Sequence, residues 1–169
     1  FAEIGLITLV FQVTASLLQP AVGAFTDKRP QPFSLAVGMA CSLVGLLLLS
    51  RAHAYGIVLI AAAIIGLGSS IFHPESSRVA RAASGGRFGF AQSFFQVGGN
   101  TGQAIGPLLA ALIIAPNGQG AVAWFVVVPL VGIALLIWVG RWYADHLGER
   151  RKAAAAPAPL TRSQWIAIL

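Results

Sequence analysis

The chain has 169 residues, of which 57% are hydrophobic and only 9% are charged. Because an ordinary soluble domain carries about 25% charged residues, this composition excludes that class and indicates a membrane protein. The formal net charge of +6 would also suit a protein that binds nucleic acid, so the placement of the basic residues has to decide between the two. Cys41 is the only cysteine, which excludes a disulfide framework and a metal site built from thiolates.

Five apolar segments are long enough to cross a bilayer as helices, for which about 20 residues are needed. They span residues 4–25, 33–50, 54–72, 90–115 and 121–140. None alternates apolar and polar residues, as the strands of a membrane barrel do. A sixth segment starts at about Ser163, and the chain opens on Phe1 without the features of a signal peptide. We therefore expect an all-α, multi-pass membrane protein that is a fragment of a longer chain.

The basic residues lie on one side of this predicted topology. All lysines and arginines except Arg51 fall in the connections that follow the first, third and fifth segments. Because cytoplasmic connections are rich in Lys and Arg, we place these connections in the cytoplasm. The positive charge is then explained by topology, and no nucleic-acid partner is expected. Aromatic belts at the two membrane surfaces are expected from both ends of the fifth segment: Trp124, Phe125, Trp138, Trp142 and Tyr143.

Polar side chains recur along one face of two segments. The first segment has Thr8, Gln12, Ser16, Gln19 and Gly23 at spacings of 4, 4, 3 and 4, and the fourth repeats these spacings with Gln92, Gln96, Asn100, Gln103 and Pro107. Buried amides cost free energy unless they are hydrogen-bonded, so each stripe is expected to face a polar surface or an aqueous cavity. The candidate substrate pathway consists of the amides in these stripes: Gln12, Gln19, Gln92, Gln96, Asn100 and Gln103.

Small residues predict two helix-packing faces. The second and fifth segments carry no amide or charged side chain and are expected to face lipid, with one small face formed by Gly38, Ser42 and Gly45. In the fourth segment Gly98, Gly102 and Gly106 recur every four residues, roughly opposite the amides, and are expected to pack closely on another helix. Pro107 predicts a bend there. A phosphate-binding loop is not supported, because no Lys-Ser/Thr pair follows the glycines. The alternative to a role of these glycines in transport is that they form a packing surface with no direct part in it.

Several motifs resemble the major facilitator superfamily. The stretch PAVGAFTDKRP, with Gly23, Asp27, Lys28 and Arg29, resembles the loop between helices 2 and 3 of these transporters, and GNTGQAIGP resembles the helix 5 motif of their drug:proton antiporters. The stretches TASLLQPAVGAFTDKRPQP, GLGSSIFHPESSRVAR and SGGRFGFAQSFFQVGGN are similar to the fosmidomycin-resistance type of efflux permease. This resemblance implies a fragment covering helices 2–6 and the start of helix 7.

The same resemblance implies a domain organisation. Residues 1–143 would form an N-terminal helical half without its helix 1, and residues 163–169 would begin helix 7 of the C-terminal half. Residues 144–162 would form a central cytoplasmic linker, in which the tract AAAAPAP predicts an extended, semi-rigid segment. An ordinary long loop is the alternative for these residues.

The function implied by the resemblance is export of a small polar molecule. We expect a monomeric efflux transporter of the bacterial inner membrane that works by alternating access and proton antiport, with the lipid bilayer as its surroundings and without a cofactor or a metal. The alternatives are an importer of a sugar or an organic acid, and a non-transporting membrane subunit. An enzyme is not expected, because no catalytic constellation appears. A phosphonate such as fosmidomycin would suit the amide stripes, but no cationic group to neutralise it is visible in these helices.

Charged residues at the predicted cytoplasmic ends are candidates for conformational gating. Asp27 is expected to pair with an arginine of the neighbouring loop or of the missing half. The candidate gating residues are Gly23, Asp27, Lys28, Arg29, Arg78 and Arg81. His73 and Glu75 are candidates for protonation, with anchoring of the loop through Arg78 or Arg81 as the alternative. Pro74 is expected to end or bend the third helix.

Overall fold

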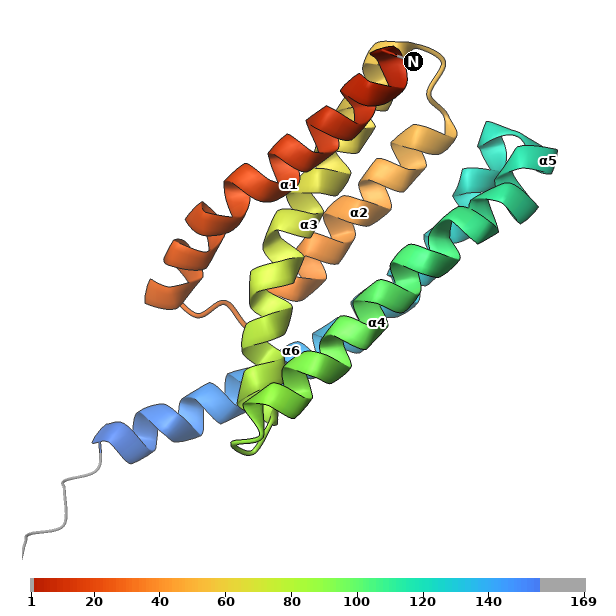
Figure 1. The fold of residues 1–169 in the computed structure, drawn as a ribbon. Helices are drawn as coiled ribbons and strands as arrows, with labels where there is room; N and C mark the ends of the chain where they lie inside the picture. The colour runs from red at the N-terminus through yellow and green to blue at the C-terminus, as the bar shows by residue number, and fades with distance from the viewer. Residues whose placement is uncertain (1, 156–169) are drawn as a thin grey trace, which may run out of the picture.

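The computed structural model describes residues 2–155 and consists of helices joined by short connections (Figure 1). In chain order these are α1 (Ala2–Lys28), α2 (Ser34–Ser50), α3 (Tyr55–Ala83), α4 (Phe88–Leu109), the π-helical η1 (Ala110–Ile114), α5 (Ala115–Asn117), the 3-10 helical η2 (Gln119–Val126) and α6 (Val127–Ala155). No strand occurs within the described residues. The expected all-α architecture is confirmed, while the predicted start of a sixth segment lies outside the described part of the chain.

Four helical stretches are long and apolar enough to cross a membrane: Ala2–Lys28, Tyr55–Ala83, Phe88–Asn117 and Gln119–Glu149. The fifth apolar helix, α2, has 17 residues, which is about 26 Å at a rise of 1.5 Å per residue. Each of the five predicted apolar segments therefore corresponds to a helix of the structure. Their positions could be predicted because, in lipid, a long apolar segment satisfies its backbone hydrogen bonds only as a helix or in a closed barrel.

Helix α3 lies between α1 and α2 and packs tightly on both (Figure 1). Its glycines permit this approach: a Cβ at Gly68 would lie 2.5 Å from the carbonyl oxygen of Gly38, and a Cβ at Gly66 would lie 2.0 Å from Oγ1 of Thr14. Gly45 faces Ile65 in the same way, at 2.3 Å. The predicted small face of α2 is thus its contact surface with α3, as expected of small residues between membrane helices.

Helix α4 stands apart from this three-helix group. None of its residues is buried, and a Cβ at Gly98, Gly102 or Gly106 would meet no other atom within 4 Å. The predicted packing of these glycines on another helix is therefore not seen among the described residues. Regular α-helix continues through Pro107 to Leu109 and changes to a π-helical turn at Ala110, so the irregularity in this span begins three residues after the proline.

The C-terminal part of α3 decides one of the two alternatives expected for Pro74, namely that it ends or bends the helix. Pro74 does not end the helix, which continues to Ala83, because proline removes only one backbone hydrogen bond and the following residues include good helix formers such as Arg and Ala. The expected long loop is reduced to a turn before α4. In that turn Gly85 and Gly86 have φ values of 57° and 91°, a conformation that glycine adopts without steric cost.

Two expectations for the C-terminal part also change. Helix α6 continues to Ala155, so the first residues of the predicted extended linker are helical, while residues 156–169 lie outside the described chain. Trp124 and Trp138 are exposed, as a belt requires, but Tyr143 is only 4% exposed and is not a belt residue. It faces the protein because α6 passes the α1–α2 connection, where a Cβ at Gly140 would lie 2.7 Å from the carbonyl oxygen of Pro32.

Two side chains tie the helices together at the end opposite the α3–α4 turn. The Gln119 amide donates hydrogen bonds to the carbonyl oxygens of Leu49, in the last turn of α2, and of Ala52, in the α2–α3 connection, at 2.6 and 3.0 Å. The Tyr55 hydroxyl donates to the carbonyl oxygen of Glu3 at 2.7 Å. These contacts fix η2 against α2 and the start of α1 against the start of α3.

Candidate functional site

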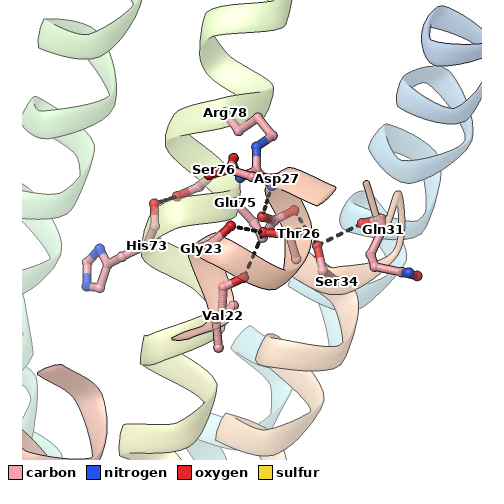
Figure 2. A network of polar contacts seen from close by, with 10 residues as sticks. All are labelled: Val22, Gly23, Thr26, Asp27, Gln31, Ser34, His73, Glu75, Ser76 and Arg78. Carbon is pink, nitrogen blue, oxygen red and sulfur yellow. Dashed lines mark hydrogen bonds and ion pairs between the residues drawn. The ribbon is translucent and has the colours of Figure 1, made fainter. Parts of the chain in front are cut away.

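An ionic network joins the ends of α1 and α3 that the charge distribution predicts to be cytoplasmic, and Arg78 of α3 is its centre (Figure 2). One guanidinium nitrogen lies 2.5 Å from Oδ1 of Asp27 on α1, and the other contacts Oε1 of Glu75 one turn earlier on α3. The two acidic partners differ sharply in environment, because the Asp27 side chain is 72% exposed and the Glu75 side chain is 1% exposed. Arg78 therefore connects a buried carboxylate to a solvent-accessible one.

A third helix enters the network through Ser34 of α2. Its Oγ lies 2.8 Å from Oε2 of Glu75 and 2.8 Å from the carbonyl oxygen of Gln31. Since a serine hydroxyl has one proton, it serves one of these two acceptors at a time. When the hydroxyl donates to Glu75, each carboxyl oxygen has a partner, Arg78 at Oε1 and Ser34 at Oε2, and these partners offset the cost of burying the group.

Thr26 forms the buried part of α1 behind Asp27. Its side chain hydroxyl donates to the carbonyl oxygens of Val22 and Gly23, at 2.9 and 3.2 Å, and the residue is 3% exposed. At Gly23 itself, an added Cβ would meet nothing within 4 Å. Glycine at this position is therefore not required by any contact within the described chain.

The predicted gating residues fall into two groups. Asp27, Arg78 and Arg81 line one cavity of about 550 Å³, together with Tyr143 and His146 of α6. The sequence left open which arginine would pair with Asp27, and in the structure this partner is Arg78. The Arg81 guanidinium instead lies over the Phe88 ring, 5.7 Å from its centre. Lys28 and Arg29 are exposed, and no ion pair found among the described side chains includes them.

Three residues of this region were missed by the sequence reasoning. Nothing in the sequence connects Ser34 with Glu75, which lie 41 positions apart. Tyr143 and His146 were assigned to an aromatic belt and to a loop, although their spacing of three residues on a helix puts them on one face. The His146 ring stacks on that of Trp142 at 5.5 Å between ring centres.

The two amide stripes meet at a second cavity, of about 680 Å³, between α1, α3 and α4. Gln12 and Gln19 line it from α1, and Gln103 lines it from α4. The hydroxyl-bearing residues on its wall are Thr8, Ser16 and Ser69. The structure therefore brings part of both predicted stripes to a shared polar space.

The remaining amides of α4 do not line this cavity. Oε1 of Gln92 accepts a hydrogen bond from Oγ of Ser77 at 2.8 Å, which links the ends of α3 and α4. Gln96 and Asn100 are exposed. Their assignment to a substrate pathway stays a prediction.

His73 and Glu75, paired as protonation candidates, point in different directions. Residues two apart on a helix are separated by about 200°, and Figure 2 shows His73 directed away from the Arg78 network. His73 lines the amide cavity, whereas Glu75 belongs to the ionic network. The alternative interpretation, anchoring through Arg78, thus describes Glu75 and not His73.

The glycine face of α4 opens onto a third, mainly apolar cavity of about 550 Å³ between α2, α4 and α6. Gly102 and Gly106 line it with Thr101 and Ile105. Gly102 is also on the wall of the amide cavity. Helix α4 therefore lines both cavities, with Gly102 on the wall of each. No cluster of three or more potential metal ligands occurs among the described residues.

Comparison with known proteins agrees with these features. The whole chain, residues 1–169, matches the model of the Major Facilitator Superfamily. The chain is 57% identical over 168 residues to the fosmidomycin resistance protein of Escherichia coli (strain K12), covering 98% of this chain and 41% of that relative. It is 42% identical over 175 residues to a Bacillus subtilis (strain 168) protein described as the uncharacterized MFS-type transporter YfnC, covering 100% of this chain and 43% of that relative. No solved structure matches.

The chain spans about two fifths of the length of these curated relatives. The resemblance drawn from the motifs is confirmed, both for the family and for the likeness to a fosmidomycin resistance protein. The matched family consists of transporters and not of enzymes. The membrane-length helices and the bacterial relatives identify a multi-pass protein of the inner membrane.

Proposed function

Because the chain belongs to the major facilitator superfamily, we propose that it forms the N-terminal helical half of an exporter of small polar drugs or metabolites. The transporter would work by alternating access and exchange its substrate for protons. The likeness to a fosmidomycin resistance protein over nearly the whole chain favours export, since efflux is one route by which a membrane transporter gives resistance. A phosphonate such as fosmidomycin is the expected substrate class.

The observation that carries the mechanism is the unequal burial of the two carboxylates around Arg78. An exposed ion pair contributes only about 0.2–1 kcal/mol, so the Asp27–Arg78 pair can break and re-form in each transport cycle. The Glu75–Arg78 pair is buried at its acidic end, and separating it would leave a charge without a partner, at a cost of about 3–5 kcal/mol. Glu75 would therefore hold Arg78 in place permanently while Asp27 engages and releases it.

The proposed role of this network is to stabilise one closure state at the cytoplasmic side. Asp27 belongs to α1 and Arg78 to α3, so a relative movement of these helices changes the distance between the two charges. The proton that drives transport is expected to be carried by an ionisable group elsewhere in the full-length transporter, because the central parts of the five spans contain no carboxylate.

The full-length protein can be tested in fosmidomycin-sensitive bacteria that lack their own exporter. We expect expression to raise the inhibitory concentration of fosmidomycin and to lower its accumulation in the cells, and we expect a protonophore to abolish both effects. Cells carrying the empty vector are the reference, and the Asp27→Asn variant at equal membrane abundance is expected to behave as they do.

The outcomes separate the candidate functions. Increased accumulation on expression would indicate an importer, and unchanged accumulation of fosmidomycin, sugars and organic acids would indicate a non-transporting subunit. Either result would overturn the proposed export activity.

A further inference from the structure

The fourth span changes its helical form near the end that lies opposite the α3–α4 turn (Figure 1). Regular α-helix ends at Leu109, and the π-helical η1 follows, in which the N–H of Ala115 donates to the carbonyl oxygen of Ala110 five residues earlier. A π turn holds one residue more than an α-helical turn, and such turns are rare and frequent at functional sites. The backbone of this span is therefore interrupted at a defined place.

Pro116 accounts for the irregular backbone. It follows η1 by two residues, supplies no N–H to the preceding turn, and in a regular α-helix its ring would clash with the carbonyl group of Leu112. The Asn117 side chain replaces a backbone donor here, because its Nδ2 donates to the carbonyl oxygen of Ile113 at 2.8 Å. Gly118 then ends the helix with a φ of 76°, which glycine adopts without steric cost.

The segment beyond the π turn is fixed to α2. Nε2 of Gln119 lies 2.6 Å from the carbonyl oxygen of Leu49 and 3.0 Å from that of Ala52. Ala121 and Val122, in the following turn of η2, are buried, and η2 packs on α2. The π turn therefore joins α4 to a segment that is held by another helix.

We propose that η1 is a joint at which α4 bends relative to α2, and that Gln119 clamps the segment beyond this joint. The inference rests on the alternating access proposed above and adds a movement within this half to it. If the half were rigid, the distance between α2 and α4 would be the same in both closure states. A joint in η1 changes this distance and leaves the distance between α2 and η2 unchanged. Pro107 is not the pivot, because regular α-helix continues through it.

The expected movement is large enough to measure. From Val97 to Ala110, α4 is about 20 Å long at 1.5 Å per residue. A change of about 20° at the joint, the lower limit for a sharp kink, would move residue 97 by about 7 Å.

The test is the distance between pairs of spin labels on the full-length protein in lipid nanodiscs. In a Cys41→Ser background, Val44→Cys with Val97→Cys reports α2 against α4, and Val44→Cys with Trp124→Cys reports α2 against η2. Each pair is measured in three states: unmodified, with Asp27→Asn, and with fosmidomycin. We expect the first pair to show two distances or a shift of about 7 Å between states. The second pair is the control and should keep one narrow distance.

Two variants of Gln119 test the clamp. Gln119→Glu has nearly the same size, but its ionised carboxylate cannot donate to the carbonyl oxygens, so the distance between α2 and η2 should become broad. Gln119→Arg keeps donors at this position and should retain the narrow distance. Equal distributions in the Glu and Arg variants would show that the Gln119 hydrogen bonds are not the clamp.

Removal of one residue tests the joint itself. Deletion of Ala111 leaves a chain of the length that a regular α-helix requires at this point. We expect the distance between α2 and α4 to become single and narrow in this variant, and efflux to be lost. A deletion variant that keeps the wild-type distances and efflux would overturn the joint.

The distances and the export assay separate this inference from the proposed function. A change in the distance between α2 and α4 without export of fosmidomycin supports the joint and overturns the drug as a substrate. A single narrow distance in all three states of a protein that exports fosmidomycin overturns the joint and leaves export intact.

Discussion

At the scale of single residues, Arg78 has one partner that it can lose and one that it cannot. Asp27 is largely exposed, and Glu75 is almost completely buried. Removing the charge of Asp27 should therefore affect transport with little effect on stability, whereas removing the charge of Arg78 should lower stability.

Asp27→Asn is expected to abolish efflux while leaving the amount and thermal stability of the membrane protein within about 1 kcal/mol of wild type, because only an exposed ion pair is lost. Drug accumulation and the unfolding temperature of the purified full-length protein measure the two effects. Asp145→Asn, at an exposed position of α6, is the control and should transport normally. Normal efflux by the Asp27 variant would show that this pair does not gate transport.

Arg78→Ala is expected to destabilise the protein by about 3–5 kcal/mol, because Glu75 would remain buried without a cation. The double variant Arg78→Ala/Glu75→Gln should recover much of this loss, since the remaining side chain is neutral. Thermal unfolding in detergent measures both. If the single and double variants were equally unstable, the buried charge would not be the cause.

Ser34 is the residue of the network that only the structure could identify. Ser34→Ala should cost about 1.5–3 kcal/mol, the range for a hydrogen bond to a charged group, and should cost less when Glu75 is replaced by Gln. A double-mutant cycle on unfolding free energies measures this coupling. Additive effects of the two substitutions would contradict a direct interaction. Asp27 and its arginine could be foreseen because charges in neighbouring cytoplasmic loops attract, but a serine on another helix gives no such signal.

At the scale of helices, the glycine patterns had different outcomes on different spans. The small face of α2 meets α3 as predicted, whereas the glycines of α4 meet no helix among the described residues. Periodicity identifies a face that can be approached closely, but it does not identify the partner. The end of α3 shows a similar limit, because a single proline was given more weight than the helix-forming residues that follow it.

Gly68→Ala and Gly102→Ala form a matched pair for these faces. The added methyl at residue 68 would lie 2.5 Å from a backbone oxygen, so we expect a loss of about 1–3 kcal/mol through overpacking. The same change at residue 102 meets open space in this half and should leave its stability unchanged. If Gly102→Ala nevertheless lowers transport in the full-length protein, its packing partner lies outside the described chain. Equal stability loss at both positions would contradict the packing seen for α2 and α3.

At the scale of the whole molecule, length and hydropathy predicted the positions of the five apolar helices. Both properties are averaged over many residues, so a local error in the prediction has little effect. The orientation of the helices stays a prediction from the charge distribution. The position of α4 relative to the other helices could not be obtained in this way, because it depends on contacts between side chains far apart in the sequence.

The orientation can be checked with single cysteines in a Cys41→Ser background. A cysteine replacing Ser84, in the α3–α4 turn, should react with a membrane-impermeant thiol reagent only after the cells are opened. A cysteine replacing His53 should react in intact cells, because the α2–α3 connection lies on the opposite side. The reverse labelling pattern would invert the proposed topology.

Helix α3 carries both His73, which lines the amide cavity, and Arg78 of the ionic network, five residues and about 7.5 Å apart along its axis. If a bound substrate favours one position of α3, thermodynamic linkage requires the state of the Asp27–Arg78 pair to alter substrate affinity by the same factor. Asp27→Asn should then change the dissociation constant of the substrate, although Asp27 does not line the amide cavity. Substrate binding and closure of the cytoplasmic side would then be thermodynamically coupled, so that a change in one shifts the other.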